Sequence, residues 1–285
     1  MEYKNCTLCP RECGVDRTAG ETGFCGCPDI ALVAKTMLHK WEEPVLAGSG
    51  GSGAIFFGGC TLGCKYCQNI AISAAPTGTP MDSTALRMEM EKLIAQGAEN
   101  IDLVTPTHFL PTVLPALMPK LPVPVVYNCG GYEKVETIRT LDGLVDIYLP
   151  DMKYGDDALA KTLSNAPCYV ETALGAIREM VKQTGAVTFR GEKMVSGVIV
   201  RHLILPGQVE NSLKVLDLLG ENFRTGEILV SLMRQYTPMG GLPAPYDRQI
   251  TEEEYEAVLS WMYLNGLQGF TQEASSATEA FVPDF

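Results

Sequence analysis

Three closely spaced cysteines have the pattern of ligands to a metal cluster. Cys60, Cys64 and Cys67 follow C-x3-C-x2-C in the segment FFGGCTLGCKYCQN, residues 56–69. Thiolates are the ligands of iron–sulfur clusters and of many zinc sites. Three ligands for a four-iron cluster leave one iron open, as a catalytic metal site does for its substrate. The next cysteine along the chain is Cys129, so no fourth ligand for an electron-transfer cluster follows nearby. A zinc site and three unrelated cysteines are the alternatives.

A second group of cysteines lies near the N-terminus. Cys6, Cys9 and Cys13 follow C-x2-C-x3-C, and Cys25 comes after eleven further residues. Four thiolates could hold zinc or a second iron–sulfur cluster, or the cysteines could bind neither, because ligand type alone does not separate these metals. Cys27 is a spare thiol or replaces Cys25.

The elements that must position these cysteines alternate between short apolar runs and longer amphipathic segments. The pattern predicts strands over residues 52–57, 101–105, 123–127, 144–149, 197–205 and 227–232. It predicts helices over residues 83–96, 110–119, 133–141, 157–163, 176–184, 211–222 and 252–265. Asp82-Ser83 and Thr251 are predicted to cap two of these helices.

Apolar strands that alternate with helices indicate parallel βαβ units. We therefore expect an α/β protein with a partial (β/α)6 TIM-like barrel, and a doubly wound sheet is the alternative. Residues 1–50 are predicted to be a Cys-rich metal-binding extension and connector, and residues 51–285 the barrel with a C-terminal helix and tail. In both architectures the chemistry belongs at the carboxyl ends of the strands.

The composition excludes several classes of function. The formal net charge of −12 argues against nucleic-acid binding, which needs clustered Lys and Arg. No apolar run approaches the length of a membrane helix, and the N-terminus has no apolar signal region, so we expect a cytoplasmic protein. In that reducing compartment clustered cysteines favour metal binding over disulfides. The solitary Cys129 and Cys168 are predicted to be small buried hydrophobes.

The central motif resembles the signature of the radical S-adenosylmethionine (SAM) superfamily. The cysteine spacing matches, and Tyr66 supplies the aromatic residue before the last cysteine. The resemblance implies a 4Fe–4S cluster whose open iron is chelated by SAM. One electron from the cluster then cleaves SAM to methionine and a 5′-deoxyadenosyl radical, and a donor such as flavodoxin or ferredoxin supplies that electron.

Within the superfamily, the chain looks most similar to pyruvate formate-lyase-activating enzymes. Four segments carry this likeness, each at or just past a predicted strand: LVTPTH (103–108), YNCGGYE (127–133), DIYLPDMKY (146–154) and VRHLILPG (200–207). The resemblance implies that Asn128, Asp151, Lys153 and Arg201 lie around SAM. For Asp151 and Lys153 the alternative is a surface ion pair.

One segment departs from the activating enzymes. Where they have Gly-Gly-Glu, this chain has Thr105-Pro106-Thr107-His108. The hydroxyls of Thr105 and Thr107 can accept from the ammonium group of SAM but carry no charge, and a simple turn is the alternative. His108 and His202 are predicted to be structural, whereas Gln235 and Tyr236 could reach the adenine or the substrate or simply pack in the core.

The sequence suggests three candidate functions, each of which can be tested. The first is activation of a glycyl radical enzyme, a protein partner, by abstraction of a glycine hydrogen. The second is radical chemistry on a small molecule or another peptide, which the missing Gly-Gly-Glu and the distinct N-terminus favour. The third is a non-catalytic iron–sulfur electron-transfer protein. The presence of three clustered cysteines instead of four argues against it.

Overall fold

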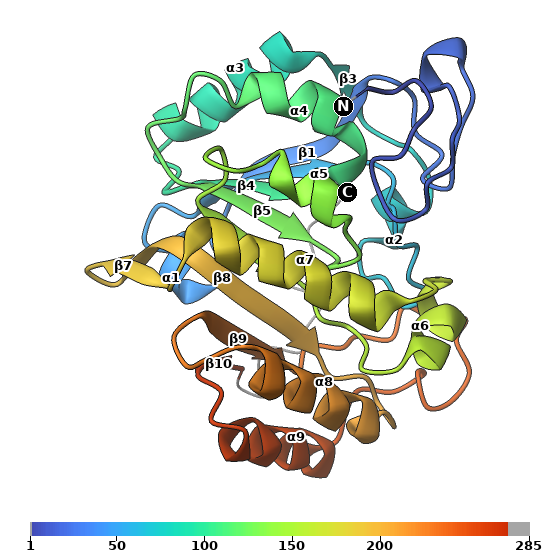
Figure 1. The fold of residues 1–285 in the computed structure, drawn as a ribbon, viewed down its shortest axis with the longest axis vertical. Helices are drawn as coiled ribbons and strands as arrows, with labels where there is room; N and C mark the ends of the chain where they lie inside the picture. The colour runs from blue at the N-terminus through green and yellow to red at the C-terminus, as the bar shows by residue number, and fades with distance from the viewer. Residues whose placement is uncertain (1, 273–285) are drawn as a thin grey trace.

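Six neighbouring parallel strands form the centre of the fold. The computed structural model describes residues 2–272. The strands lie side by side in chain order (Figure 1): β2 (Ser52–Phe57), β4 (Ile101–Val104), β5 (Val125–Cys129), β6 (Ile147–Pro150), β8 (Lys193–Leu203) and β9 (Ile228–Met233). All six correspond to predicted strands, which confirms the partial barrel.

Further strands extend this sheet at its edges. β1 (Ala31–His39) pairs antiparallel with β2 and with β3 (Thr79–Met81), while β10 (Gly269–Thr271) lies parallel to β9 and β7 (Thr188–Arg190) pairs with β8. Among the described residues the strand order ends at β3 and β10, so the barrel is open. The predicted N-terminal extension and connector, residues 1–50, thus contains β1 and the short helix α1 (Pro44–Ala47), which the sequence analysis did not predict.

Helices cover the outer face of the sheet (Figure 1). They are α3 (Ser83–Ala95), α4 (Leu110–Ala116), α5 (Val135–Arg139), α6 (Asp157–Ser164), α7 (Tyr169–Thr184), α8 (Val209–Asn222) and α9 (Glu252–Leu264), with α2 (Ile70–Ser73) after the cysteine loop. Both predicted caps are confirmed: Asp82 accepts from the Ala85 amide, and Thr251 forms a capping box with Glu254. Helix α7 begins earlier than the predicted residue 176.

The two faces of the strands bury different sets of side chains. On the outer face, residues such as Tyr127 and Val200 pack in the main core. The alternating inner positions form a second cluster with Leu46 of α1, made of Val126, Ile147, Leu149, Met194 and Ile199. Because side chains alternate along a strand, Asn128, Asp151 and Arg201 continue the inner face of β5, β6 and β8 beyond these apolar residues. The barrel thus has an apolar lower layer and a polar layer at the strand ends.

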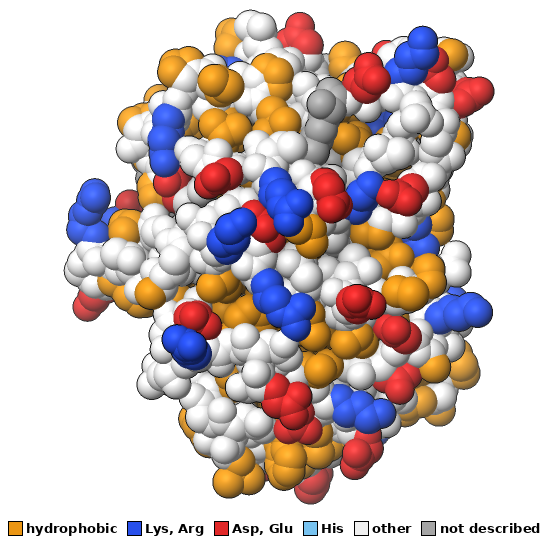
Figure 2. Space-filling model, in the orientation of Figure 1, with side chains coloured by type: hydrophobic (Ala, Val, Ile, Leu, Met, Phe, Trp, Pro, Cys, Tyr) orange, Lys and Arg blue, Asp and Glu red, His pale blue; other side chains and the backbone are white. Residues whose placement is uncertain are grey.

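Charged side chains of both signs are mixed on the face that the helices cover. Figure 2 shows Lys and Arg interspersed with Asp and Glu across the helical face. No helix within residues 2–272 is both long and apolar enough to cross a bilayer.

Candidate active site

The three cysteines of the central motif line one cavity at the carboxyl ends of the strands. Cys60, Cys64 and Cys67 lie in the loop that follows β2. The cavity is completed by residues of the strand ends and their loops, among them Thr105, Asn128, Gly130, Asp151, Lys153, Arg201, Met233 and Gln235. The fold therefore brings together residues that are far apart in the sequence, as the βαβ pattern predicts.

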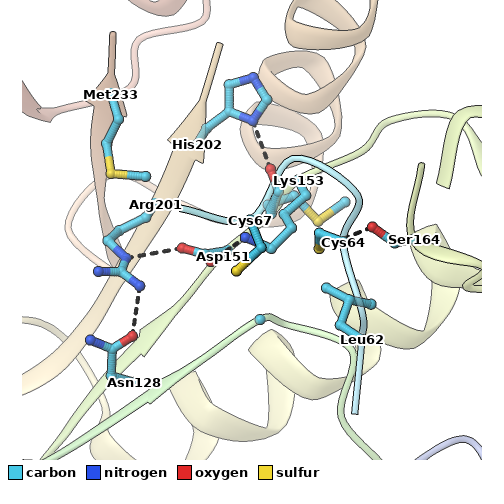
Figure 3. Close-up of polar contacts among 12 residues, drawn as sticks. Leu62, Cys64, Cys67, Asn128, Asp151, Lys153, Ser164, Arg201, His202 and Met233 are labelled. Carbon is cyan, nitrogen blue, oxygen red and sulfur yellow. Dashed lines mark hydrogen bonds and ion pairs between the residues drawn. The ribbon is translucent and has the colours of Figure 1, made fainter. Parts of the chain in front are cut away.

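Each of the three sulfur atoms accepts a hydrogen bond from the protein. The Leu62 amide donates to Cys60 Sγ at 3.3 Å, and the Ser73 hydroxyl donates to Cys67 Sγ at 3.4 Å. The hydroxyl of Ser164 donates to Cys64 Sγ at 3.0 Å (Figure 3). Such donors orient thiolate ligands and tune a bound iron–sulfur cluster.

Two glycines let the loop fold against its neighbours. A Cβ on Gly58 would strike the Thr77 carbonyl oxygen. Gly59 has a φ of +77°, and a Cβ there would strike the buried sulfur of Cys27. Glycine is needed at both positions because a side chain has no room, and at Gly59 also because of the left-handed backbone.

The buried surroundings of the cysteine thiols disfavour the thiolate form, and a nearby positive charge offsets this effect. Burial raises the pKa of Cys60, and it raises the pKa of Cys64 to about 12. The Lys153 ammonium opposes this shift at both thiols. Three thiols that face one cavity, each with a hydrogen-bond donor, fit a cluster whose irons would stabilise the thiolates.

Within residues 2–272, no three His, Cys, Asp or Glu side chains converge closely enough to share one metal ion. A cluster does not require this, since each cysteine binds a different iron.

A network of charged and amide groups forms the opposite wall of the cavity (Figure 3). Arg201 donates from Nε to Asp151 Oδ1 at 3.0 Å and from Nη2 to Asn128 Oδ1 at 2.6 Å. Lys153 Nζ donates to Asp151 Oδ2 at 2.5 Å. Burial alone would raise the pKa of Asp151, but the charges of Arg201 and Lys153 outweigh it and lower that pKa. Two cations therefore share one carboxylate at this wall, and their remaining N–H groups can bind an anionic ligand group.

Two acidic residues that the sequence analysis did not identify contact members of this network. Glu42 Oε1 lies 3.7 Å from Arg201 Nη1. Asp102 is fully buried in β4 and accepts from Asn128 Nδ2 at 3.4 Å. Burial, and then the charge of Glu42, raises the pKa of Asp102 well above its usual value. An aspartate inside the apolar run IDLV was a signal for such a role, since burying a charge is costly. Glu42 gave no comparable signal.

The two predicted threonines have different positions. Thr105 lines the cavity with a φ of +60°. Thr107 is 1% exposed, donates to Glu133 Oε1 at 2.9 Å and lies 2.9 Å from the Tyr127 hydroxyl. It is not among the described residues that line the cavity, so this placement does not support direct contact with a cofactor.

The other predicted residues near the site are mainly structural. His108 Nε2 pairs with the Gly58 carbonyl and His202 bridges the Met152 carbonyl and the Ser212 hydroxyl. Burial lowers the pKa of both histidines to about 4, so they are neutral at pH 7 and the structural prediction is confirmed.

The aromatic residue of the motif, Tyr66, lines the cavity with the cysteines. Tyr66 is buried and its ring lies against those of Tyr154 and Tyr236. Gln235 and Tyr236 line the cavity, as one of the two alternatives predicted. The prediction for the solitary cysteines was correct for the buried Cys129 and wrong for Cys168, which is exposed because it precedes α7 at the surface.

Comparison with known proteins gives one clear relative. No family model matches this chain. The uncharacterised protein MJ0674 of Methanocaldococcus jannaschii is 30% identical over 270 residues, which cover 90% of this chain and 74% of that protein. The chain belongs to the MJ0674 family.

Solved structures show the fold of this family member. A radical SAM methyltransferase from Sphaerobacter thermophilus superposes with a TM-score of 0.54 at 15% identity, over 78% of this chain and 66% of the methyltransferase. SuiB of Streptococcus suis bound to S-adenosylmethionine gives a TM-score of 0.52 at 12% identity, over 75% of this chain and 48% of SuiB. Spore photoproduct lyase gives 0.51 at 10% identity, over 76% of this chain and 74% of the lyase. The MJ0674 family member thus has the radical SAM partial-barrel fold, and it spans less than two thirds of the methyltransferase and about half of SuiB.

Proposed function

We propose that this protein is a radical SAM enzyme. The observation that carries the proposal is one cavity, at the carboxyl ends of the strands, that combines three hydrogen-bonded cysteine sulfurs with a wall that contains Lys153 and Arg201. A 4Fe–4S cluster on Cys60, Cys64 and Cys67 would supply the electron that cleaves SAM to a 5′-deoxyadenosyl radical. The protein would bind, orient and shield these cofactors.

Different residues of the cavity wall would bind different groups of SAM. Lys153 and Arg201 carry the positive charge that suits the carboxylate of SAM. Asn128 and Thr105 offer neutral oxygens to its ammonium group, and Asp151 holds both cations in place. Thr107 would act only through Glu133 and Tyr127.

We infer glycyl radical enzyme activation as the first candidate reaction. Its support is the likeness of the four strand-end segments to the activating enzymes, three of which supply Asn128, Asp151, Lys153 and Arg201 to the cavity wall. The enzyme would take a hydrogen atom from a glycine of the partner protein. A flavodoxin or ferredoxin would supply the electron.

The second candidate is action on a small molecule or another peptide. A second cavity, of about 780 Å³, shares Arg201, Met233 and Gln235 with the first and extends to Glu42 and Glu43. A small substrate in this cavity would lie next to the SAM site. This arrangement favours a substrate smaller than a protein loop.

One anoxic experiment tests the shared chemistry. The chain is reconstituted with iron and sulfide, reduced with dithionite and supplied with SAM, and 5′-deoxyadenosine is measured by chromatography. We expect product from the wild type and from Cys168→Ala, and none from Cys64→Ala. Absence of product from a chain that holds the cluster would favour the electron-transfer alternative. Addition of a glycyl radical enzyme, followed by spin resonance for a glycyl doublet, separates the first candidate from the second.

A further inference from the structure

The N-terminal cysteine segment is docked directly on the loop of the central cysteines. Arg11 donates from Nε to the Thr61 carbonyl at 2.9 Å and from Nη2 to the Leu62 carbonyl at 3.1 Å. Cys27 Sγ donates to the Gly58 carbonyl at 3.4 Å. In Figure 1 the blue N-terminal segment lies beside α2, which follows the central loop. The two cysteine groups are therefore neighbours.

Hydrogen bonds gather the N-terminal cysteines in one turn. The Gly14 amide, next to Cys13, donates to the Cys6 carbonyl at 3.0 Å. The Phe24 amide donates to Cys13 Sγ at 3.3 Å, so Cys25 directly follows a residue that contacts Cys13. Cys27 differs, because its thiol donates to two carbonyls, those of Cys25 and Gly58.

A buried cation beside these thiols has no carboxylate partner within residues 2–272. Arg17 is 1% exposed and donates to the carbonyls of Pro28 and His108. Its positive charge acts on Cys25. A buried guanidinium with only neutral partners is costly, and an anionic thiolate centre beside it would offset that cost.

We propose that Cys9, Cys13 and Cys25, with Cys6 of the same C-x2-C pair, hold a second iron–sulfur cluster that passes electrons to the central one. A zinc site would need these thiolates to converge on one ion, and within residues 2–272 no three His, Cys, Asp or Glu side chains do so. In a cluster each cysteine binds a different iron, and unlike zinc a cluster can carry an electron. The central cluster as the acceptor of these electrons rests on the proposed function. The second metal site does not depend on that function.

The electron transfer balances as two one-electron steps. A reduced low-potential donor protein gives one electron to the second cluster, lowering the charge on its irons by one. The second cluster then gives that electron to the central cluster and returns to its oxidised state. No proton or bond is exchanged in either step, and the donor protein is the reductant that is consumed.

Metal analysis of a full-length variant without the central ligands tests the site. In Cys60→Ala/Cys64→Ala/Cys67→Ala, reconstituted without oxygen, we expect about four irons and four sulfides per chain. Adding Cys9→Ala and Cys13→Ala should abolish this iron, whereas adding Cys27→Ser or Cys168→Ala should not. Iron near zero in the first variant, or one zinc per chain, would overturn the proposal. This measurement needs no turnover, so its result is independent of the radical chemistry.

A second measurement covers the case in which that variant does not fold. Cys9→Ala/Cys13→Ala alone should lose about half of the wild-type iron but keep the spin-resonance signal of the central cluster with dithionite. Reduction of that cluster by reduced ferredoxin should slow at least tenfold. An unchanged iron content or an unchanged rate of reduction would contradict the relay.

Discussion

The residue on which the cavity wall depends most is Asp151, since it is the shared partner of two cations. Replacing Asp151 with Asn removes the carboxylate that Lys153 and Arg201 share, while the Glu42 carboxylate lies farther off, 3.7 Å from Arg201. Breaking a buried ion pair by removing one partner typically costs about 3–5 kcal/mol. We therefore expect the free energy of unfolding, measured with urea, to fall by about that amount. Glu91→Gln, which breaks the exposed pair with Arg87, should change it by less than about 0.5 kcal/mol. Similar losses in both variants would contradict the role of Asp151.

Glu133 gives a prediction about pH. Burial raises its pKa from 4.5 to about 8, so the folded chain keeps a proton that the unfolded chain releases above pH 4.5. The stabilisation is full below the unfolded pKa and is lost as pH rises toward about 8. We expect the free energy of unfolding to decline over that interval in the wild type, and Glu133→Gln to decline less. Urea titrations at pH 5, 6, 7 and 8 measure this, and parallel curves for the two proteins would rule out the assignment.

Residue types and spacing predicted that Cys60, Cys64 and Cys67 belong to one site, because a single short loop carries all three. Asn128, Asp151, Lys153 and Arg201 needed the family resemblance, and the structure places all four on the cavity. The position of Thr107 away from the cavity could not be predicted, because the side-chain direction after β4 depends on the backbone of Thr105, which has a positive φ. Glu42 could not be predicted, since it reaches Arg201 only through the position of β1 and α1 within the barrel.

At the scale of elements, the cysteine loop depends on Gly59. An alanine there would place a methyl group against the buried sulfur of Cys27 on a left-handed backbone. Gly143→Ala is a matched control, because Gly143 has a φ of +75° but open space around it. Both variants pay the backbone cost of about 1–2 kcal/mol, and only Gly59→Ala adds a clash. We expect Gly59→Ala to unfold at a lower temperature than Gly143→Ala and to bind less iron after reconstitution. Equal unfolding temperatures and equal iron contents of the two variants would show that the Cys27 side chain moves aside at no cost.

Element prediction succeeded where periodicity and caps agreed. The capping residues Asp82 and Thr251 begin α3 and α9 where expected, and β2 matches its predicted bounds. β1 was missed because the run ALVAKTMLH belongs to an edge region with only partial burial, which weakens the apolar signal. The first turns of α7 were missed because Thr172 and the small residues around it weaken the apolar period.

At the scale of the whole molecule, the cavity wall is assembled from strands that are distant in sequence. β2, β5, β6 and β8 each contribute, and residues 1–30 close the side of the loop. The site therefore exists only when the full sheet is formed. A ligand that binds this site stabilises the whole folded chain by mass action.

This coupling predicts a thermal shift that reports SAM binding without turnover. For the reconstituted chain, SAM at a hundredfold excess over its Kd should add about 2.7 kcal/mol to the free energy of unfolding and raise Tm by a few degrees. Lys153→Met removes a cation from the cavity wall and should reduce the shift at the same SAM concentration, because the SAM carboxylate loses a partner. The Cys60→Ala/Cys64→Ala/Cys67→Ala chain should show a smaller shift still, since it lacks the open iron. Differential scanning fluorimetry without oxygen measures all three proteins, and equal shifts would mean that SAM binds outside the cavity formed by the strand ends.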